Sequence, residues 1–500
     1  MANNLSLSNV INVTLVPSIA GLSEFNTANL LLYSTEQPIT DFGTDIYRIY
    51  YNASSVAEDF GVNSLTYKMA VAVFSQTPNI LSNSGALIIA PRREWESQAE
   101  TFNKLKSKVL FCGWMTTDDI ANDIENLSDQ EYFAGVDANQ ESDSLETIQA
   151  LTDPNFTIIL NGEEESSSGA AITFDFSSAL NLNDVAGIIK DGINNHFGTT
   201  DWVVDVNEGK FFMFCQDASV KSISLDDTEL TQAIKLDSAS NPSYGEYQQI
   251  AGLASVVNAE NNKINFVVSN SDSDVDGAFT NIKDATLQKT RCLFYGGTET
   301  EAKIMMASYA SKAMSTIFEA SLTTQTMHLK PLTGVLPDPI MTETLLSKCK
   351  SAGVDTYVSI EGVPCVFSTG ANGFFDEVFN ELWFVNAIQT AGFNYLRQTG
   401  TKIPQTERGM DGLKNAYTQV CVRGINNGFL AQGTWTSSDT FGNPDTFKRN
   451  IETSGFYVYS TPVAQQSKAD REDRKAPLVQ IAIKTAGAIH STNVMIYVNL

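Results

Sequence analysis

Short apolar runs alternate with helical segments along much of the chain, and this alternation restricts the possible folds more than any other feature. Residues 28–33 and 86–90 are apolar runs of strand length, and a helical pattern over residues 64–74 precedes the second run. A wholly apolar strand that follows a helix is typical of a sheet with helices on both faces and some parallel pairing. The sequence therefore predicts a multidomain protein of mixed α/β and α+β class, with mixed-sheet core domains and helices.

The middle of the chain has a different composition. Residues 113–170 contain 14 Asp and Glu residues and no Lys or Arg, and the acidic run at residues 163–165 leads into serines typical of a loop. Residues 171–225 then show a β-α-β-β order of strand and helix patterns. We therefore expect an acidic, β-rich outer insertion over residues 113–285. The first α/β domain would then consist of residues 26–112 together with residues 286–325.

The region after residue 290 has the most regular patterns. They predict helices over residues 299–320, 339–351, 375–397 and 407–427, the last ended by Gly428. Strands are expected over residues 456–460 and 478–483, and two more flank a turn at Glu361 and Gly362. These elements indicate a C-terminal domain over residues 326–485.

Both ends of the chain contain β-branched runs. Residues 1–25 and 486–500 include the strand-forming residues Val10, Ile11, Val13 and Leu15, and Val494, Ile496 and Val498. An unpaired strand exposes backbone donors and acceptors and favours pairing with another chain. We therefore predict that both ends are extended arms whose strands are completed by other chains. The alternative is that each end pairs within its own chain.

The net charge argues against several functions. The chain has 58 Asp and Glu against 32 Lys and Arg, a formal net charge of −26. Binding to a phosphate backbone requires clustered Lys and Arg, so we expect no nucleic-acid partner. The first residues lack the basic and apolar regions of an export signal, and no apolar run reaches the ~18 residues of a membrane helix. We therefore expect a cytosolic protein without membrane insertion.

The sequence contains only weak matches to catalytic or metal-binding motifs. The six cysteines have no C-x-x-C spacing and mostly lie among apolar residues, which predicts buried side chains rather than disulfides or metal ligands. Nucleophile-elbow, P-loop and zinc-protease motifs are missing from the sequence. The stretch from Asp272 to Gly277 has the acid spacing of a calcium loop, but Lys283 stands where the loop needs a bidentate Glu, so we interpret it as a surface turn. Trp383 has the spacing of a helix core. We expect no catalytic residue, no cofactor and no metal.

Several segments, most of them near the C-terminus, carry a family resemblance. They are residues 455–459 (GFYVY), 464–472 (AQQSKADRE), 476–483 and 486–491, with residues 328–335 (HLKPLTGV) and the runs at 10–15 and 28–32. Together these segments resemble the contractile phage tail sheath proteins. The resemblance covers the N-terminal strand, the first α/β layer and nearly all of residues 300–500.

This resemblance implies a structural subunit and no catalytic mechanism. Copies would polymerise as hexameric rings stacked helically around a tail tube, with baseplate and tail terminator proteins as further partners. The terminal arms would add strands to a sheet in neighbouring copies, while the folded bodies move rigidly as the sheath contracts and drives the tube through the host envelope. The protein would be assembled in the host cytoplasm and would reside in the virion.

The distribution of bases suggests an orientation. Most bases of the last third lie near the C-terminus, so we expect the C-terminal domain to face the tube and neighbouring copies, with contacts from Lys468, Arg471, Arg474 and Lys475. An ordinary surface role for Arg471 and Arg474 is the alternative. Two other functions stay open at this point: another self-assembling virion protein, such as a capsid or tube component, and a cytosolic hydrolase.

Overall fold

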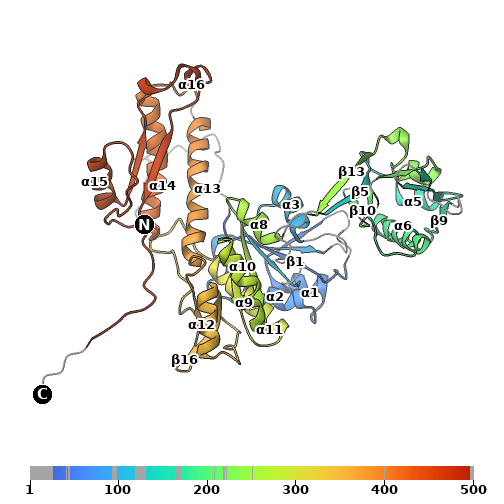
Figure 1. Cartoon of the computed structure of the whole chain (residues 1–500), viewed down its shortest axis with the longest axis horizontal. Helices are drawn as coiled ribbons and strands as arrows, with labels where there is room; N and C mark the ends of the chain where they lie inside the picture. The colour runs from blue at the N-terminus through green and yellow to red at the C-terminus, as the bar shows by residue number, and fades with distance from the viewer. Residues whose placement is uncertain are drawn as a thin grey trace, which may run out of the picture. The chain divides into compact units, whose positions relative to one another are not determined.

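The structure is a computed structural model that describes residues 26–40, 42, 46–92, 98–118, 131–160, 163–164, 171–207, 209–217, 220, 222–249, 252–398 and 400–495. These residues form two compact units (Figure 1). The α/β unit consists of residues 26–316 and 326–378. The C-terminal unit consists of residues 317–325 and the described residues from 379 onward.

An eight-stranded sheet forms the centre of the α/β unit, in the order β17-β16-β15-β14-β4-β1-β3-β2. β1 pairs in parallel with both β3 and β4, and β14, β15 and β16 extend the parallel part. The two edge strands run antiparallel to their neighbours. The strands are β1 (Leu30–Ser34), β2 (Arg48–Tyr50), β3 (Leu87–Pro91), β4 (Gly113–Thr116), β14 (Ile264–Ser269), β15 (Thr290–Phe294), β16 (Asp355–Ile360) and β17 (Val363–Phe367). The expected apolar strands β1 and β3 are confirmed and lie buried near the middle of the sheet.

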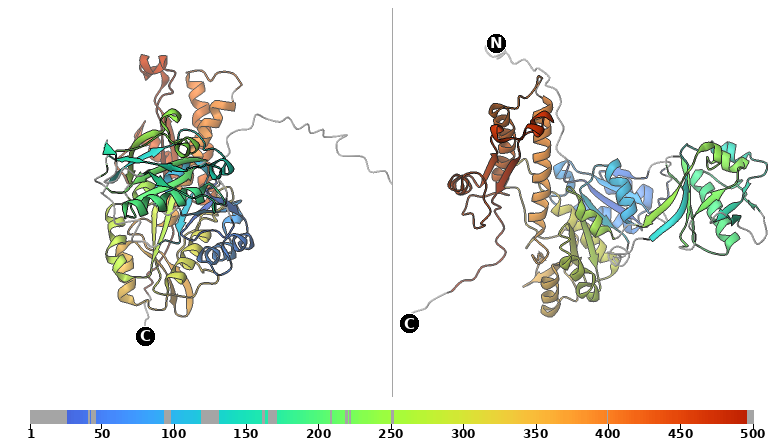
Figure 2. Two further views of the ribbon diagram at one scale, coloured as in Figure 1. Left: turned by 90° about the vertical axis from the view of Figure 1, so that its right-hand side faces the viewer. Right: turned by 45° about the horizontal axis from the view of Figure 1, so that its top comes forward.

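Helices cover both faces of this sheet (Figure 2). Leu31 and Tyr33 point to the side of α3 (Gln98–Lys108) and α8 (Leu253–Ala259), and strand alternation turns Leu30 and Leu32 to the other side. The first side also carries α9 (Asp272–Asp276), α10 (Ala278–Asp284) and α12 (Glu343–Ala352), which pack on β14, β15 and β16. The other side carries α1 (Ala53–Phe60), α2 (Leu65–Ser75) and α11 (Glu299–Ala313).

Side-chain caps explain where several of these helices begin. Thr298 and Glu301 form a capping box at the start of α11, in which the Glu301 carboxylate accepts the Thr298 N–H at 2.8 Å. Thr342 caps α12, so that helix begins at Glu343 rather than at residue 339. Gly353, with φ 74°, ends it.

Residues 131–249 form an insertion between β4 and α8 with a core of its own. Its main sheet has the order β10-β11-β5-β13, and its first strand β5 pairs with its last strand β13, so that residues 131 and 249 lie side by side. Phe156, Ile189 and Phe211 are fully buried in its core. The elements are β5 (Glu131–Asp137), α5 (Leu145–Gln149), β6 (Asn155–Phe156), β7 (Ile158–Leu160), β8 (Glu163–Glu164), β9 (Ile172–Thr173), α6 (Leu182–Phe197), β10 (Trp202–Asn207), β11 (Lys210–Cys215), β12 (Ile223–Leu225), α7 (Glu229–Ala233) and β13 (Ser243–Gln249).

The expected domain boundaries at residues 113, 285 and 326 differ from those of the structure. β4 and the segment from α8 to α10 belong to the central sheet and its helices, so the insertion is shorter than residues 113–285. β16 pairs in parallel with β15, so residues 326–378 lie in the α/β unit and not in a C-terminal domain. Acidic composition reflects solvent exposure, whereas pairing between distant strands sets these boundaries, and composition cannot reveal that pairing.

The C-terminal unit combines two long helices with a small sheet. Its elements are α13 (Phe375–Gln398), which begins in the α/β unit, α14 (Glu407–Asn427), α15 (Pro444–Ser454), β18 (Phe456–Ser460), α16 (Lys468–Glu472) and β19 (Val479–Ile483). Trp383 of α13 is 3% exposed and stacks on Phe318 with ring centroids 4.7 Å apart, which confirms its expected core role. α14 and β18 begin and end at the predicted residues, whereas α15 was not predicted.

Candidate assembly site

β18 and β19 form a two-stranded antiparallel sheet, and no third described strand joins them. The Lys484 N–H donates to the Gly455 carbonyl at 2.8 Å, so these two residues form a hydrogen-bonded pair. Hydrogen-bonded and non-hydrogen-bonded pairs alternate along antiparallel strands. The backbone groups that point outward are therefore those of Phe456, Val458 and Ser460 on one edge and Val479, Ile481 and Ile483 on the other.

Helices cover the faces of this strand pair. Met410 and Leu413 of α14 pack with Val479, and Phe447 and Ile451 of α15 pack with Ala482. Most side chains of both strands nevertheless remain only half-buried. Two-stranded sheets are marginal by themselves, and a further strand at either edge would extend the ladder and bury more apolar surface.

An aromatic cluster supports one face of the pair and was missed in the sequence. Tyr457 stacks on Phe441 at 5.6 Å and on Tyr459 at 6.1 Å, and Phe447 meets Tyr457 edge to face at 5.5 Å. The sequence could have indicated this cluster, because the two tyrosines stand two positions apart in one strand and therefore share a face.

The chain leaves this sheet as an exposed segment. The Ala486 N–H donates to the Phe429 carbonyl at 2.8 Å, after which residues 486–495 form neither helix nor strand. Ile489 is 93% exposed and Val494 is 75% exposed. The strand expected around Val494 is therefore not formed over its described part, because no described strand pairs with it there. Ile496 and Val498, and likewise Val10, Ile11, Val13 and Leu15, lie outside the described residues.

The four predicted basic contact residues lie on α16 and just after it, and all four are exposed. Lys468 pairs with Glu472 at 3.6 Å, and Lys475 pairs with Asp473 at 2.9 Å. Arg471 and Arg474 have no ion pair with any described residue. The two arginines are thus available to a partner, whereas the two lysines are paired within the chain.

The most strongly perturbed titratable cluster is a buried structural network in the α/β unit. The Asp355 side chain is 0% exposed and accepts hydrogen bonds from Arg291 Nε at 3.0 Å and Tyr309 Oη at 2.6 Å. Burial would lower the pKa of Arg291, but the adjacent Asp355 carboxylate raises it; burial also raises the pKa of Tyr309. A fully buried carboxylate that already accepts this many hydrogen bonds has no access to a substrate. The cluster joins β15, β16 and α11.

Doubly wound sheets usually bind ligands at the carboxyl ends of the central strands. At the ends of β1 and β4 the described side chains bond to one another. The Thr35 N–H donates to Thr117 Oγ1 at 2.8 Å, and Arg92 pairs with Asp118 at 3.4 Å. The first contact ties the end of β1 to the end of β4, and the second ties the end of β3 to the end of β4.

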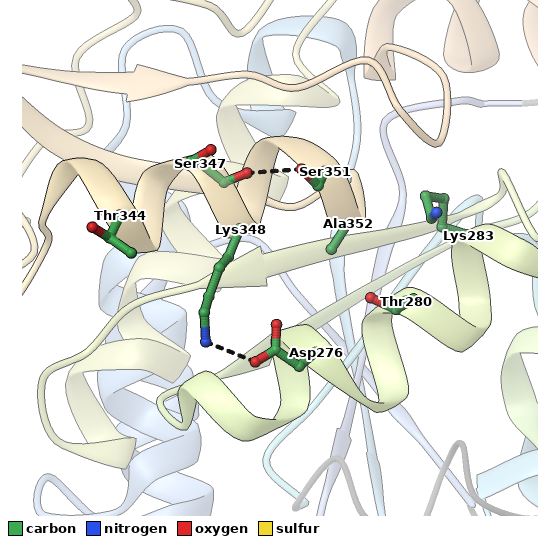
Figure 3. A pocket seen from close by; sticks show the side chains of 8 residues that line it. All are labelled: Asp276, Thr280, Lys283, Thr344, Ser347, Lys348, Ser351 and Ala352. Atoms are coloured by element: carbon green, nitrogen blue, oxygen red, sulfur yellow. Dashed lines mark hydrogen bonds and ion pairs between the residues drawn. The ribbon is translucent and has the colours of Figure 1, made fainter.

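The calcium-like stretch does not form a loop. Residues 272–276 form helix α9, and Asp276 pairs with Lys348 of α12 at 2.7 Å across a groove of about 370 Å³ (Figure 3). The groove is lined by hydroxyl side chains and two lysines, and the second lysine, Lys283, pairs with Asp284 at 2.7 Å. The ion pair therefore links α9 to α12.

Three further observations concern the described part of the chain. No three His, Cys, Asp or Glu side chains there are grouped in a way that could hold a metal ion. All six cysteines are buried and unpaired, and burial raises the pKa of Cys112 to about 12. No described helix is long and apolar enough to cross a membrane.

Comparison with known proteins assigns the C-terminal part of the chain. Residues 375–498 match the family described as E217 tail sheath protein gp31-like, C-terminal domain. No curated protein matches the chain. Among solved structures, the contracted helical sheath of the anti-feeding prophage is similar at 9% identity and TM-score 0.48, with 99% of each chain covered.

Two further structures are similar over nearly the whole chain. The anti-feeding prophage baseplate has 8% identity and TM-score 0.46, with 98% of each chain covered. A sheath tail protein from Listeria innocua has 10% identity and TM-score 0.35, with 94% of this chain and 97% of that chain covered. Because the TM-scores of these three structures are below 0.5, the assignment depends on the family match.

The fold is of mixed α/β class, and the C-terminal unit contains a two-stranded sheet that no further strand of the described residues joins. Residues 375–498, most of which lie in that unit, match the C-terminal domain of the E217 tail sheath protein gp31-like family. The expected resemblance to tail sheath proteins is confirmed for these residues, and the expected mixed α/β class is confirmed by the sheets and helices described above.

Proposed function

We propose that this chain polymerises as the sheath of a contractile phage tail and that strand addition at the β18–β19 pair joins its copies. The observation that carries the proposal is the combination of a two-stranded sheet without further described strands and an exposed apolar segment beside it. The exposed segment can pair with an open edge of the sheet, because strand addition satisfies the backbone groups of both partners.

The exposed segment has sufficient reach. The roughly ten residues from 486 to 495 span up to about 33–36 Å when extended, which is the size of a small domain. A segment of that length can lie on a second copy while its own copy keeps its fold. The N-terminal run with Val10, Ile11, Val13 and Leu15 is proposed to act in the same way.

The resulting polymer would consist of hexameric rings stacked helically around a tail tube, ended by baseplate and tail terminator proteins. On contraction the folded bodies would move rigidly while the added strands keep them connected. The tube would then pass through the host envelope and deliver the phage genome. In this mechanism no side chain performs catalysis, and the protein acts as part of the virion.

Removal of the exposed segment tests the proposal. We expect purified wild-type protein to form tubes or rings in negative-stain micrographs. A variant that lacks residues 486–500 should stay monomeric in size-exclusion chromatography, with an unchanged far-UV circular dichroism spectrum. Deletion of residues 1–16 should act in the same way.

A matched control keeps the length of the segment. Substitution of Ile489, Val494 and Met495 by serine leaves the backbone able to pair but removes apolar burial, so assembly should weaken without being lost. Tubes of normal appearance from the variant without residues 486–500 would contradict the proposal.

A further inference from the structure

The eight-stranded sheet ends at β17, a strand that would attract strands of other chains if its outer edge were open. Its five residues, Val363–Phe367, include no charged side chain and are mostly apolar. Apolar edge strands of this kind pair readily with other chains. Strand addition depends on main-chain hydrogen bonds, so the arms proposed to join the copies would not by themselves distinguish this edge from the β18–β19 pair.

Residues 328–330 cover this edge, and they belong to one of the segments that carry the family resemblance. The Leu329 N–H donates to the Val366 carbonyl at 2.8 Å, and the Val366 N–H donates to the Lys330 carbonyl at 2.9 Å. Both outward backbone groups of Val366 are thus bonded within the chain. We call residues 328–330 the edge strap, because they occupy the place that a further strand would take.

The neighbouring outward positions of this edge are closed in other ways. Outward and inward backbone groups alternate along an antiparallel strand, so those of Pro364 and Ser368 point the same way as those of Val366. Proline has no N–H to offer an added strand. The Ser368 N–H donates to Nδ1 of His328, also in the strap, at 3.2 Å. At these three positions no N–H is left to bond another chain.

Two further sets of contacts fix the residues that follow the strap. The Leu332 N–H donates to Oη of Tyr357 in β16 at 3.2 Å, and this hydroxyl donates to the Leu332 carbonyl at 3.3 Å. Thr333 and Gln76, which follows α2, exchange two hydrogen bonds of 2.9 Å each. Gln76 is 2% exposed. The strap is therefore continuous with a segment that is anchored to both the sheet and a helix.

The C-terminal strand pair has no such cover among the described residues. β18 and β19 have five residues each, their outward positions contain no proline, and no described backbone segment bonds along either outer edge. At the far edge of the eight-stranded sheet, β2 has only three residues, and very short edge strands give an added strand little to bond. The two sheets therefore differ in whether a strand of another copy can pair with them.

We propose that the edge strap excludes strands of other copies from β17 and so directs strand addition to the β18–β19 pair. The inference rests on the proposed polymerisation by strand addition and identifies what decides between two apolar edges. Such a choice requires a feature that rejects the wrong site, because backbone pairing by itself gives little selectivity. The strap provides that feature within each copy.

A photo-cross-linking experiment locates the partner of the C-terminal arm. A benzophenone-bearing phenylalanine replaces Val494 in the full-length chain, and cross-linked dimers are isolated on denaturing gels after irradiation and mapped by mass spectrometry. With the strap intact, the cross-links should fall within residues 456–483 of the second copy and not on residues 363–368. Cross-links to residues 363–368 would overturn the exclusion, whereas a chain that gives no cross-linked dimers would overturn the proposed function instead.

Opening the strap provides the converse test. Leu329→Pro removes the N–H that bonds Val366, and proline cannot adopt the φ of 61° found at Leu329. The share of cross-links on residues 363–368 should then rise at least about tenfold, the factor that one hydrogen bond typically contributes.

A matched control makes the same exchange at another exposed leucine of the same segment. The Leu336 N–H bonds to no described group, so Leu336→Pro should leave the cross-link pattern unchanged. An unchanged pattern in folded Leu329→Pro, or an equal change in this control, would overturn the role of the strap.

Hydrogen exchange tests the strap in the wild-type chain, without a substitution that could impair folding. Below the concentration at which the chain polymerises, the Val366 N–H should exchange at least about a hundredfold more slowly than the Val458 N–H, because only the Val366 N–H is bonded within its own copy. Polymerisation should slow the exchange of Val458 and leave that of Val366 unchanged. Fast exchange at Val366 in the unassembled chain would overturn the strap.

Discussion

The substitution Asp355→Asn tests whether the buried ion pair holds the α/β unit together. The Asp355 carboxylate accepts hydrogen bonds from Arg291, Tyr309, Ser368 and Thr369, with the Thr369 N–H at 2.7 Å and Ser368 Oγ at 3.0 Å. Asparagine keeps the size of the side chain but removes its charge and replaces an acceptor oxygen with a donor group.

The expected loss of stability follows from the charge that the substitution leaves unbalanced. The Arg291 guanidinium would keep its bonds to the carbonyls of Gly373 at 2.7 Å and Thr369 at 2.9 Å, but no carboxylate would balance its charge. Removing one partner of a buried ion pair usually costs about 3–5 kcal/mol. We therefore expect the equilibrium constant for unfolding of the α/β unit to rise roughly 150- to 5,000-fold.

Urea unfolding at neutral pH, followed by circular dichroism, measures this loss. An exposed ion pair provides the control: Lys348 and Asp276 lie 2.7 Å apart with side-chain exposures of 39% and 60%. Lys348→Met should cost less than about 1 kcal/mol. Replacing both buried partners, Arg291→Met with Asp355→Leu, should cost less than Asp355→Asn, because no charge is left unbalanced. A loss below about 1 kcal/mol for Asp355→Asn would refute the reasoning.

Three further predictions concern the strand edge, a buried carboxylate and two turns. The Val458 N–H points outward, so Val458→Pro should leave the strand pair folded but block assembly. Tyr457→Pro should instead disrupt the strand pair itself. Circular dichroism and micrographs distinguish the two outcomes. Burial raises the pKa of Asp376 from 3.8 to about 6, so the folded state binds this proton more tightly than the unfolded state does. The free energy of unfolding should therefore fall as pH rises from about 4 to about 6, and Asp376→Asn should flatten that dependence in urea titrations; an unchanged slope would contradict the cause given. Gly362→Ala should lower the free energy of unfolding by about 1–2 kcal/mol, because Gly362 has a φ of 83°. Gly353→Ala should lower it further, because the added Cβ would also lie 2.7 Å from a backbone nitrogen. Equal losses in thermal unfolding would show that this contact relaxes.

Local signals were sufficient for several elements of the fold. Gly428 ends α14 with a φ of 91°, and Glu361 and Gly362 form the turn between β16 and β17 with φ values of 49° and 83°. Each of these residues determines the backbone close to itself, so the sequence shows it directly. The same type of signal marks α15, where Asn443 caps the helix, Pro444 takes its first position and Gly455 follows its end.

Other features depend on contacts that the sequence does not show. α11 ends at Ala313 although a helical pattern continues toward residue 320, and no glycine or proline marks the end. Phe318 instead packs with Trp383 and Phe379, which lie more than sixty positions further along the chain. The first strand of the β-α-β-β order expected over residues 171–225 is reduced to Ile172 and Thr173, which pair only with β6.

The candidate site was predictable in part. The basic residues and the β-branched ends are visible in the sequence, but the local pairing of Lys468 and Lys475, and the exposure of Arg471 and Arg474, required side-chain geometry. The open edges of β18 and β19 also required the structure, because a missing third strand is a property of the sheet and not of either segment.

The two units differ in how far each is complete without a partner. In the α/β unit, the buried side chains of Asp355 and Arg291 are hydrogen-bonded to groups of the same chain. In the C-terminal unit, two outward rows of backbone groups find no partner strand among the described residues, and most of the strand side chains beside them stay half-buried. Addition of strands from other copies would therefore complete the C-terminal unit while leaving the α/β unit unchanged. A polymer connected only through such added strands can let its subunits rotate, because main-chain pairing at an edge places few constraints on the rest of each copy.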